Sequence, residues 1–176
     1  MNIRQLIIVV AVGFVGHQGI TASMPTNSFG IYLVAESVDW RDSATNWTTR
    51  KLSAKPVISE ADIVAYSFTN HLLTLTPEAA KRITEFHIAK LVEPFVVVAN
   101  GERIYRGAFV LSICSQSVAL PSITLWGGQQ FTIYTSLPPN SLFIGRTYAA
   151  PFSVTERDPR SDDRIRVALE IMHKLK

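Results

Sequence analysis

The strongest constraint on the fold is a run of apolar residues at 94–99, which Asn100-Gly101 ends abruptly. A strand that is apolar on both faces belongs inside a sheet, because either face would otherwise leave apolar surface in water. An Asn-Gly pair between two β-rich runs is typical of a type I′ turn, since both turn residues must adopt positive φ. The sequence therefore predicts an interior hairpin whose return strand occupies residues 102–110.

Further β-rich runs predict the other strands of the sheet. These runs occupy residues 29–36, 63–68, 72–75, 122–126 and 130–136. The second and third runs are separated by Thr69-Asn70-His71. A short polar connection of this kind between two β-rich runs predicts a second hairpin.

Two segments carry the signals of helices. Thr76 is a favourable N-cap and Pro77 suits the first helical position, so one helix is predicted to begin there. Residues 158–176 predict an amphipathic helix capped by Asp158 or Ser161. The order of the segments predicts an α+β fold, in which a mixed, mostly antiparallel sheet carries the two main helices on one face.

The first 23 residues have the pattern of a secretory signal peptide. Arg4 supplies the positive start, residues 6–15 are apolar, and small residues end the segment at Ser23. The apolar run is shorter than the roughly 20 residues that a spanning helix needs. We therefore expect cleavage after Ser23 and a periplasmic or secreted protein without a further membrane span. An uncleaved N-terminal anchor is the alternative.

Composition excludes several classes of protein. The formal net charge is +3, from 17 Lys and Arg against 14 Asp and Glu, and these charges are scattered along the chain. Without a basic stripe or an aromatic RNA-binding motif, we expect no nucleic-acid partner, and at most a weak association with anionic membrane surfaces. An apolar content of 47% excludes a disordered chain. The single cysteine, Cys114, excludes an internal disulfide.

The common catalytic and cofactor motifs are missing from the sequence. It contains no Gly-x-Ser-x-Gly elbow, no Ser-x-x-Lys motif and no His-x-x-x-His pair. No glycine-rich turn joins a predicted strand to a helix, so a phosphate loop or dinucleotide fingerprint is not expected either. The sequence thus predicts no catalytic residues, no metal and no cofactor, and we expect a protein that is not an enzyme.

One stretch of the chain, residues 107–145, contains no Asp, Glu, Lys or Arg. Its residues are either buried sheet with hydroxyl-rich loops or a neutral contact surface, because the centres of protein interfaces are depleted of charge. If the sheet has an open edge, a partner could add a strand to it. The candidate partner-binding residues at and around this stretch are Arg103, Tyr105, Arg106, Phe109 and Gln130.

Three segments resemble a known family in their order and spacing. They are Pro-Val-Ile-Ser-Glu-Ala-Asp-Ile at 56–63, Leu-Thr-Leu-Thr-Pro-Glu-Ala-Ala-Lys at 73–81, and Pro-Phe-Val-Val-Val-Ala-Asn-Gly-Glu-Arg-Ile-Tyr at 94–105. Together they resemble the first periplasmic, or head, domain of the SecD/SecDF protein-export subunits. The resemblance covers residues 53–105 well and the rest of the chain poorly.

The resemblance implies an exported α+β domain that contacts polypeptide, with a SecD head-like domain at 56–176. Residues 24–55 are then an N-terminal strand and a polar excursion of the same domain. The turn at 100–101 is Asn-Gly where that family has Asp-Gly. The translocase's transmembrane helices have no counterpart after the domain, so proton-driven export is not expected of this chain.

These observations predict an exported, non-enzymatic domain that binds a protein or peptide partner in the cell envelope. One alternative is a carbohydrate or small-ligand binder that uses Trp40, Trp47 or Trp126 as a stacking platform. Another is an envelope hydrolase whose site matches no common motif.

Overall fold

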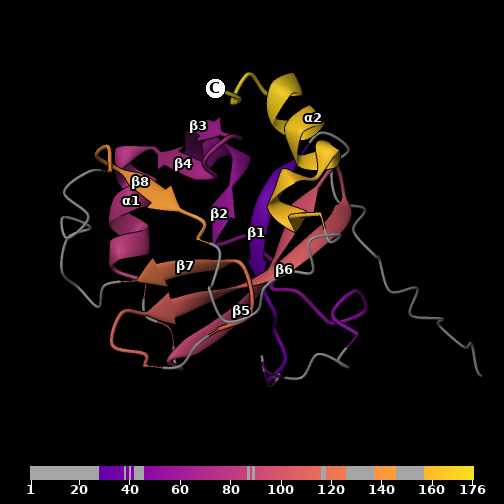
Figure 1. Cartoon of the computed structure of the whole chain (residues 1–176), viewed down its shortest axis with the longest axis vertical. Coiled ribbons are helices and arrows are strands. Elements are labelled where there is room, and N and C mark those ends of the chain that lie inside the picture. The colour runs from indigo at the N-terminus through magenta and orange to yellow at the C-terminus, as the bar shows by residue number, and fades with distance from the viewer. Residues whose placement is uncertain are drawn as a thin grey trace, which may run out of the picture.

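The computed structural model describes residues 28–37, 39, 41, 46–86, 88, 90–115, 118–125, 137–145 and 157–176 (Figure 1). The predicted leader at 1–23 and the predicted strand at 130–136 lie outside these residues. Among the described residues, no helix combines the length and the hydrophobicity that crossing a bilayer would require.

A five-stranded sheet forms the larger layer of the fold, with the strand order β2-β1-β5-β6-β7 (Figure 1). Its strands are β1 (Phe29–Leu33), β2 (Ile58–Ser59), β5 (Val92–Ala99), β6 (Glu102–Leu111) and β7 (Ser122–Leu125). All neighbours are antiparallel except β6 and β7, which run parallel. The predicted mixed, mostly antiparallel sheet is therefore confirmed, and so is the interior position of β5.

The turn between β5 and β6 has the conformation that its sequence predicts. Asn100 has φ of 52° and Gly101 has φ of 78°, and Ala99 lies opposite Glu102 in the ladder. Asparagine and glycine are the residues that adopt this left-handed conformation at least cost. The local sequence thus sets the pairing of β5 and β6 next to the turn, and the register shifts by one residue between Val98 and Val97.

A second, three-stranded sheet has the order β3-β4-β8, where one continuous sheet was predicted. Its strands are β3 (Ile63–Ser67), β4 (Leu72–Leu75) and β8 (Ser141–Phe143), so the hairpin predicted at 63–75 is confirmed. The two sheets meet at one antiparallel bridge between Ser122 and Gly145. Strand β8 was not predicted, because three residues are too few to show the alternation of apolar and polar side chains that marks a strand.

Helix α1 (Pro77–Thr84) begins as its sequence predicts. The Thr76 hydroxyl accepts a hydrogen bond of 3.2 Å from the backbone N–H of Ala79, and Pro77 occupies the first helical position. Of the short 3₁₀ turns, η1 (Glu60–Asp62) precedes β3 and η2 (Pro159–Ser161) precedes the last helix.

The C-terminal helix α2 (Asp163–Ile171) is shorter than predicted. Its N-cap is Asp162, whereas the predicted cap Asp158 is the N-cap of the separate turn η2. At its end, His173 adopts φ of 55° and the N–H of Lys174 donates to the carbonyl of Leu169. This left-handed residue turns the chain out of the helix.

One main core lies on a single face of the five-stranded sheet. It combines the buried residues of α1 and α2 with apolar side chains from both sheets, so the two helices share that face as predicted. The opposite face carries two smaller clusters, centred on Val96 and Val98 and on Ala108 and Val118. Strand β5 is therefore covered on both faces, as its uninterrupted apolar sequence requires.

The cap of α1 yields a stability prediction. Thr76→Ala removes the oxygen that accepts from the N–H of Ala79, so we expect the free energy of unfolding to fall by about 1 kcal/mol. Urea denaturation followed by circular dichroism measures the change. Thr84→Ala is the matched control, because the Thr84 hydroxyl only donates to the carbonyl of Ala80 within the same helix. Equal losses in the two variants would contradict a capping role for Thr76.

Candidate functional site

Of the five residues predicted to bind a partner, four are described, and these four do not form one exposed surface. Tyr105 and Phe109 are 4% and 0% exposed and belong to the main core, so they offer no side chain to a partner in this conformation. Arg103 and Arg106 are half-buried, and Gln130 lies outside the described residues. Tyr105 and Phe109 are buried because β6 is an interior strand, whose neighbours β5 and β7 complete a sheet covered on both faces.

Arg103 has a structural role instead. Its Nη1 donates a hydrogen bond of 2.9 Å to the backbone carbonyl of Trp47, which ties the turn at 46–49 to the sheet. The half-buried Trp47 packs against the cluster of Val34, Val96 and Val98. Trp47 is thus part of a small core and is not a free stacking platform. Trp40 and Trp126, the other tryptophans of the carbohydrate hypothesis, lie outside the described residues.

Exposed apolar side chains occur at the end of the large sheet where β5 begins and β6 ends. Ile113 is 78% exposed and Leu91 is 44% exposed. Their segments are joined there, because the N–H of Leu111 donates to the carbonyl of Leu91 and the N–H of Cys114 donates to that of Leu111. We call the exposed Leu91 and Ile113, together with the half-buried Leu111, which also packs against the main core, the apolar end surface.

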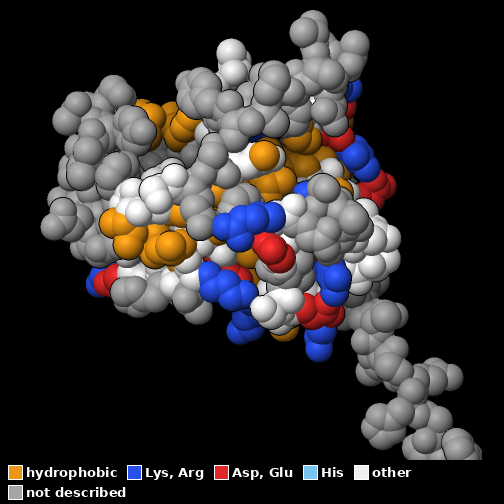
Figure 2. All heavy atoms as spheres, turned by 60° about the horizontal axis from the view of Figure 1, so that its bottom comes forward, with side chains coloured by type: hydrophobic (Ala, Val, Ile, Leu, Met, Phe, Trp, Pro, Cys, Tyr) orange, Lys and Arg blue, Asp and Glu red, His pale blue; other side chains and the backbone are white. Residues whose placement is uncertain are grey.

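The apolar end surface draws two of its three residues from the charge-free stretch at 107–145. Figure 2 turns the lower part of the molecule toward the viewer and shows hydrophobic side chains open to solvent on a face that also carries Lys, Arg, Asp and Glu side chains. The other described residues of the stretch mainly complete β6, β7 and β8 or cover the sheet, as Val118 does. The stretch therefore serves both as buried sheet and, at its exposed corner, as neutral surface.

A second candidate site is a buried polar cluster made of Tyr66, His71, Asp158 and Arg160. The Tyr66 hydroxyl lies 3.0 Å from Nδ1 of His71. Arg160, only 7% exposed, donates from Nε and Nη2 to the carboxylate of Asp158 and from Nη1 to the carbonyl of Ile144 at 2.6 Å. The cluster joins two segments that are distant in sequence, the β3–β4 hairpin with Tyr66 and His71 and the turn η2 with Asp158 and Arg160, so no single contiguous motif contains it.

Burial sets the protonation states of this cluster. It raises the pKa of Tyr66 well above the usual tyrosine value, and burial together with the nearby Arg160 lowers the pKa of His71. Burial opposes the charged form of Asp158, but hydrogen bonds from Arg160 still hold the pKa of Asp158 below its usual value. At neutral pH the cluster therefore holds a neutral tyrosine, a neutral histidine and an ion pair.

A tyrosine and a histidine at hydrogen-bond distance could in principle exchange a proton with a substrate. Tyr66 is 1% exposed and His71 is 6% exposed, so a substrate has no access to them in this conformation. Within the described part of the chain, no group of three His, Cys, Asp or Glu side chains is placed to hold a metal ion. We assign the buried cluster a structural role.

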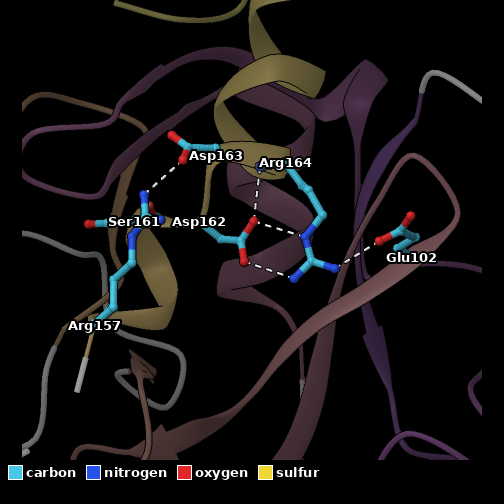
Figure 3. Close-up of polar contacts among 6 residues, drawn as sticks. All are labelled: Glu102, Arg157, Ser161, Asp162, Asp163 and Arg164. Carbon is cyan, nitrogen blue, oxygen red and sulfur yellow. Dashed lines mark hydrogen bonds and ion pairs between the residues drawn. The ribbon is translucent and has the colours of Figure 1, made fainter. Parts of the chain in front are cut away.

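The start of α2 carries an exposed ionic network (Figure 3). Arg164 binds the carboxylate of Asp162 at 2.8 Å and that of Glu102 at 2.7 Å, which links the helix to the β5–β6 hairpin. Arg157 binds Asp163 at 2.9 Å and also the carbonyl of Ser161. Acidic side chains at a helix N-terminus favour the helix, and exposed pairs of this kind contribute about 0 to 1 kcal/mol each.

Comparisons with models of protein families, with curated proteins and with solved structures find no match for this chain. The resemblance to the SecD head domain consequently stays a prediction from the three sequence segments. The choice between a binding domain and an enzyme therefore rests on the exposure and contacts of the described residues.

Proposed function

We propose that the protein is an exported, non-enzymatic domain that binds a protein or peptide partner in the cell envelope through the apolar end surface. The observation that carries this proposal is the exposure of Ile113 and Leu91 on two hydrogen-bonded segments. Single exposed apolar residues are ordinary, but exposed apolar residues on neighbouring segments are typical of interaction sites.

The chemistry of the surface indicates what the partner offers. Leu91 and Ile113 present exposed aliphatic groups beside the half-buried Leu111, so the complementary segment has aliphatic or aromatic side chains. An extended or unfolded polypeptide exposes such side chains. The resemblance to the SecD head domain supports the same class of partner.

Binding of an unfolded polypeptide tests the proposed surface. We expect Leu91→Glu with Ile113→Glu to weaken binding at least tenfold, because two carboxylates would have to lose water in the interface. The probe is a fluorescently labelled, reduced and carboxymethylated polypeptide, and anisotropy measures its affinity. Val64→Glu with Ile171→Glu is the matched control, since these two side chains are 49% and 51% exposed on other elements.

Equal weakening in the two double variants would show that the apolar end surface has no special role. Binding that is absent from the unaltered protein would remove the proposal altogether. Mass spectrometry of the protein recovered from its cell envelope tests the location separately, with an N-terminus at Met24 as the expected result.

A further inference from the structure

His71 occupies an unusual position for a polar residue. It lies in the turn between β3 and β4, is 6% exposed, and adopts φ of 55°, in the left-handed region. Its side chain contacts the Tyr66 hydroxyl, and its carbonyl accepts a hydrogen bond of 3.1 Å from the N–H of Ile144. The turn is therefore held from both its side chain and its backbone.

Hydrogen bonds connect the surroundings of His71 to the segments before and after the C-terminal helix. Before α2, Arg160 donates to the carbonyl of Ile144, the residue bonded to His71. After α2, the N–H of Tyr66 donates to the carbonyl of Lys174 at 2.7 Å, and the carbonyl of Tyr66 accepts from the N–H of Lys176 at 2.9 Å. The C-terminal tail thus runs along the edge of β3, beside the tyrosine that contacts His71.

We infer that the buried polar cluster is an acid-sensitive latch, which fastens α2 and the C-terminal tail to the β3–β4 hairpin and loosens when His71 gains a proton. In a neutral imidazole, Nδ1 can accept a hydrogen bond from the Tyr66 hydroxyl. A protonated ring carries a hydrogen on both nitrogens, so Nδ1 can then only donate and the tyrosine hydroxyl has to reorient. The resulting cation would also be buried near the Arg160 guanidinium.

The described titratable and charged groups that face His71 come from two places. Strand β3 contributes the Tyr66 hydroxyl, and the turn η2 with its N-cap contributes the opposed charges of Arg160 and Asp158. On β6, the buried Tyr105 lies near Tyr66 and that ion pair. Asp158 favours a proton on His71, but its carboxylate is already bound by Arg160 on both oxygens. Burial and Arg160 together outweigh the effect of Asp158, so the pKa of His71 is lowered.

The direction of the pH effect follows from this lowered pKa. In the opened state His71 takes up its proton near pH 6.5, its usual value, whereas in the closed state it does so only at lower pH. Below about pH 6.5 the opened state therefore binds more protons, and the closed state loses stability as the pH falls. One such group raises the equilibrium constant for opening by at most about tenfold per pH unit.

Hydrogen exchange of the full chain tests the latch. At pH 7.5, 6.5 and 5.5, after correction for the intrinsic exchange rate, we expect protection of residues 163–176 to fall by several-fold while that of β5 and β6 is retained. His71→Asn removes the titrating group and suits the left-handed backbone, so its protection should not change with pH. His173→Asn is the matched control, because His173 also has φ of 55° but is exposed, and it should behave as the unaltered protein does.

The inference is overturned if His71→Asn keeps the pH dependence of the unaltered protein, or if α2 and β5 lose protection together. Tyr66→Phe provides a second test that leaves every backbone contact in place. Because it removes the hydroxyl that meets Nδ1, we expect weaker protection of 163–176 already at pH 7.5. Full protection in that variant would also contradict the latch.

Discussion

Replacing Gly107 with alanine is expected to lower the free energy of unfolding by about 3 kcal/mol, the upper part of the usual range for overpacking a core. Gly107 lies on β6 directly opposite Phe95 on β5. A Cβ atom at this position would overlap the ring of Phe95 and lie 2.6 Å from the carbonyl oxygen of Pro121. Glycine is required here for close approach and not for an unusual φ.

Neither neighbour of Gly107 can move away easily. Phe95 is fully buried, and its ring lies 5.0 Å from that of Phe109 in the main core. The carbonyl of Pro121 accepts a hydrogen bond from the N–H of Ala108, at the start of the parallel β6–β7 pairing. Relief of the overlap would have to displace either an aromatic pair or a strand.

Urea denaturation measures the loss, with Gly145→Ala as the matched control. A Cβ at position 145 would meet its nearest neighbour, an atom of the Phe143 ring, at 3.4 Å, an ordinary contact, so we expect that variant to change stability by less than about 1 kcal/mol. Phe95→Leu should recover part of the loss when combined with Gly107→Ala, because it removes the overlapping ring atoms. Similar losses at 107 and 145, or strictly additive effects of the two changes, would contradict the steric explanation.

The parts of the fold that follow from local chemistry could be predicted from the sequence. Asn100-Gly101 determines its own turn, and Thr76 with Pro77 determines the start of α1, because each signal acts within a few residues. The division into two sheets could not be predicted, since it depends on which distant strands pair, β1 with β5 in one sheet and β4 with β8 in the other.

The predicted site residues show a similar limit. Alternation along β6 places Tyr105 and Phe109 on one face, but alternation alone does not say that both faces of that strand are covered. The buried polar cluster was not predicted either, because His71 and Arg160 meet only through tertiary packing. The available signals were a histidine in a hairpin turn and an arginine after Asp158-Pro159, and both are common on protein surfaces.

Arg160 is the position where a charge change is expected to cost most. Arg160→Met removes a 7%-exposed guanidinium that binds the Asp158 carboxylate through two nitrogens and the carbonyl of Ile144 through a third. The carboxylate, 21% exposed, and the carbonyl would then lack their partner, so we expect the free energy of unfolding to fall by about 3 kcal/mol. Lysine should not restore it, because an ammonium group cannot reproduce the planar fork.

Arg164→Met is the control that shows whether the loss of stability in Arg160→Met comes from burial or from charge pairing alone. Arg164 binds two carboxylates, those of Asp162 and Glu102, but its side chain is 48% exposed, so water and salt screen both pairs and we expect a loss below about 1 kcal/mol. Raising the salt concentration should reduce the contribution of Arg164 and leave that of Arg160 nearly unchanged. If the two variants unfold at the same urea concentration, the buried cluster contributes no more than a surface ion pair, because burial is the main difference between the two arginines.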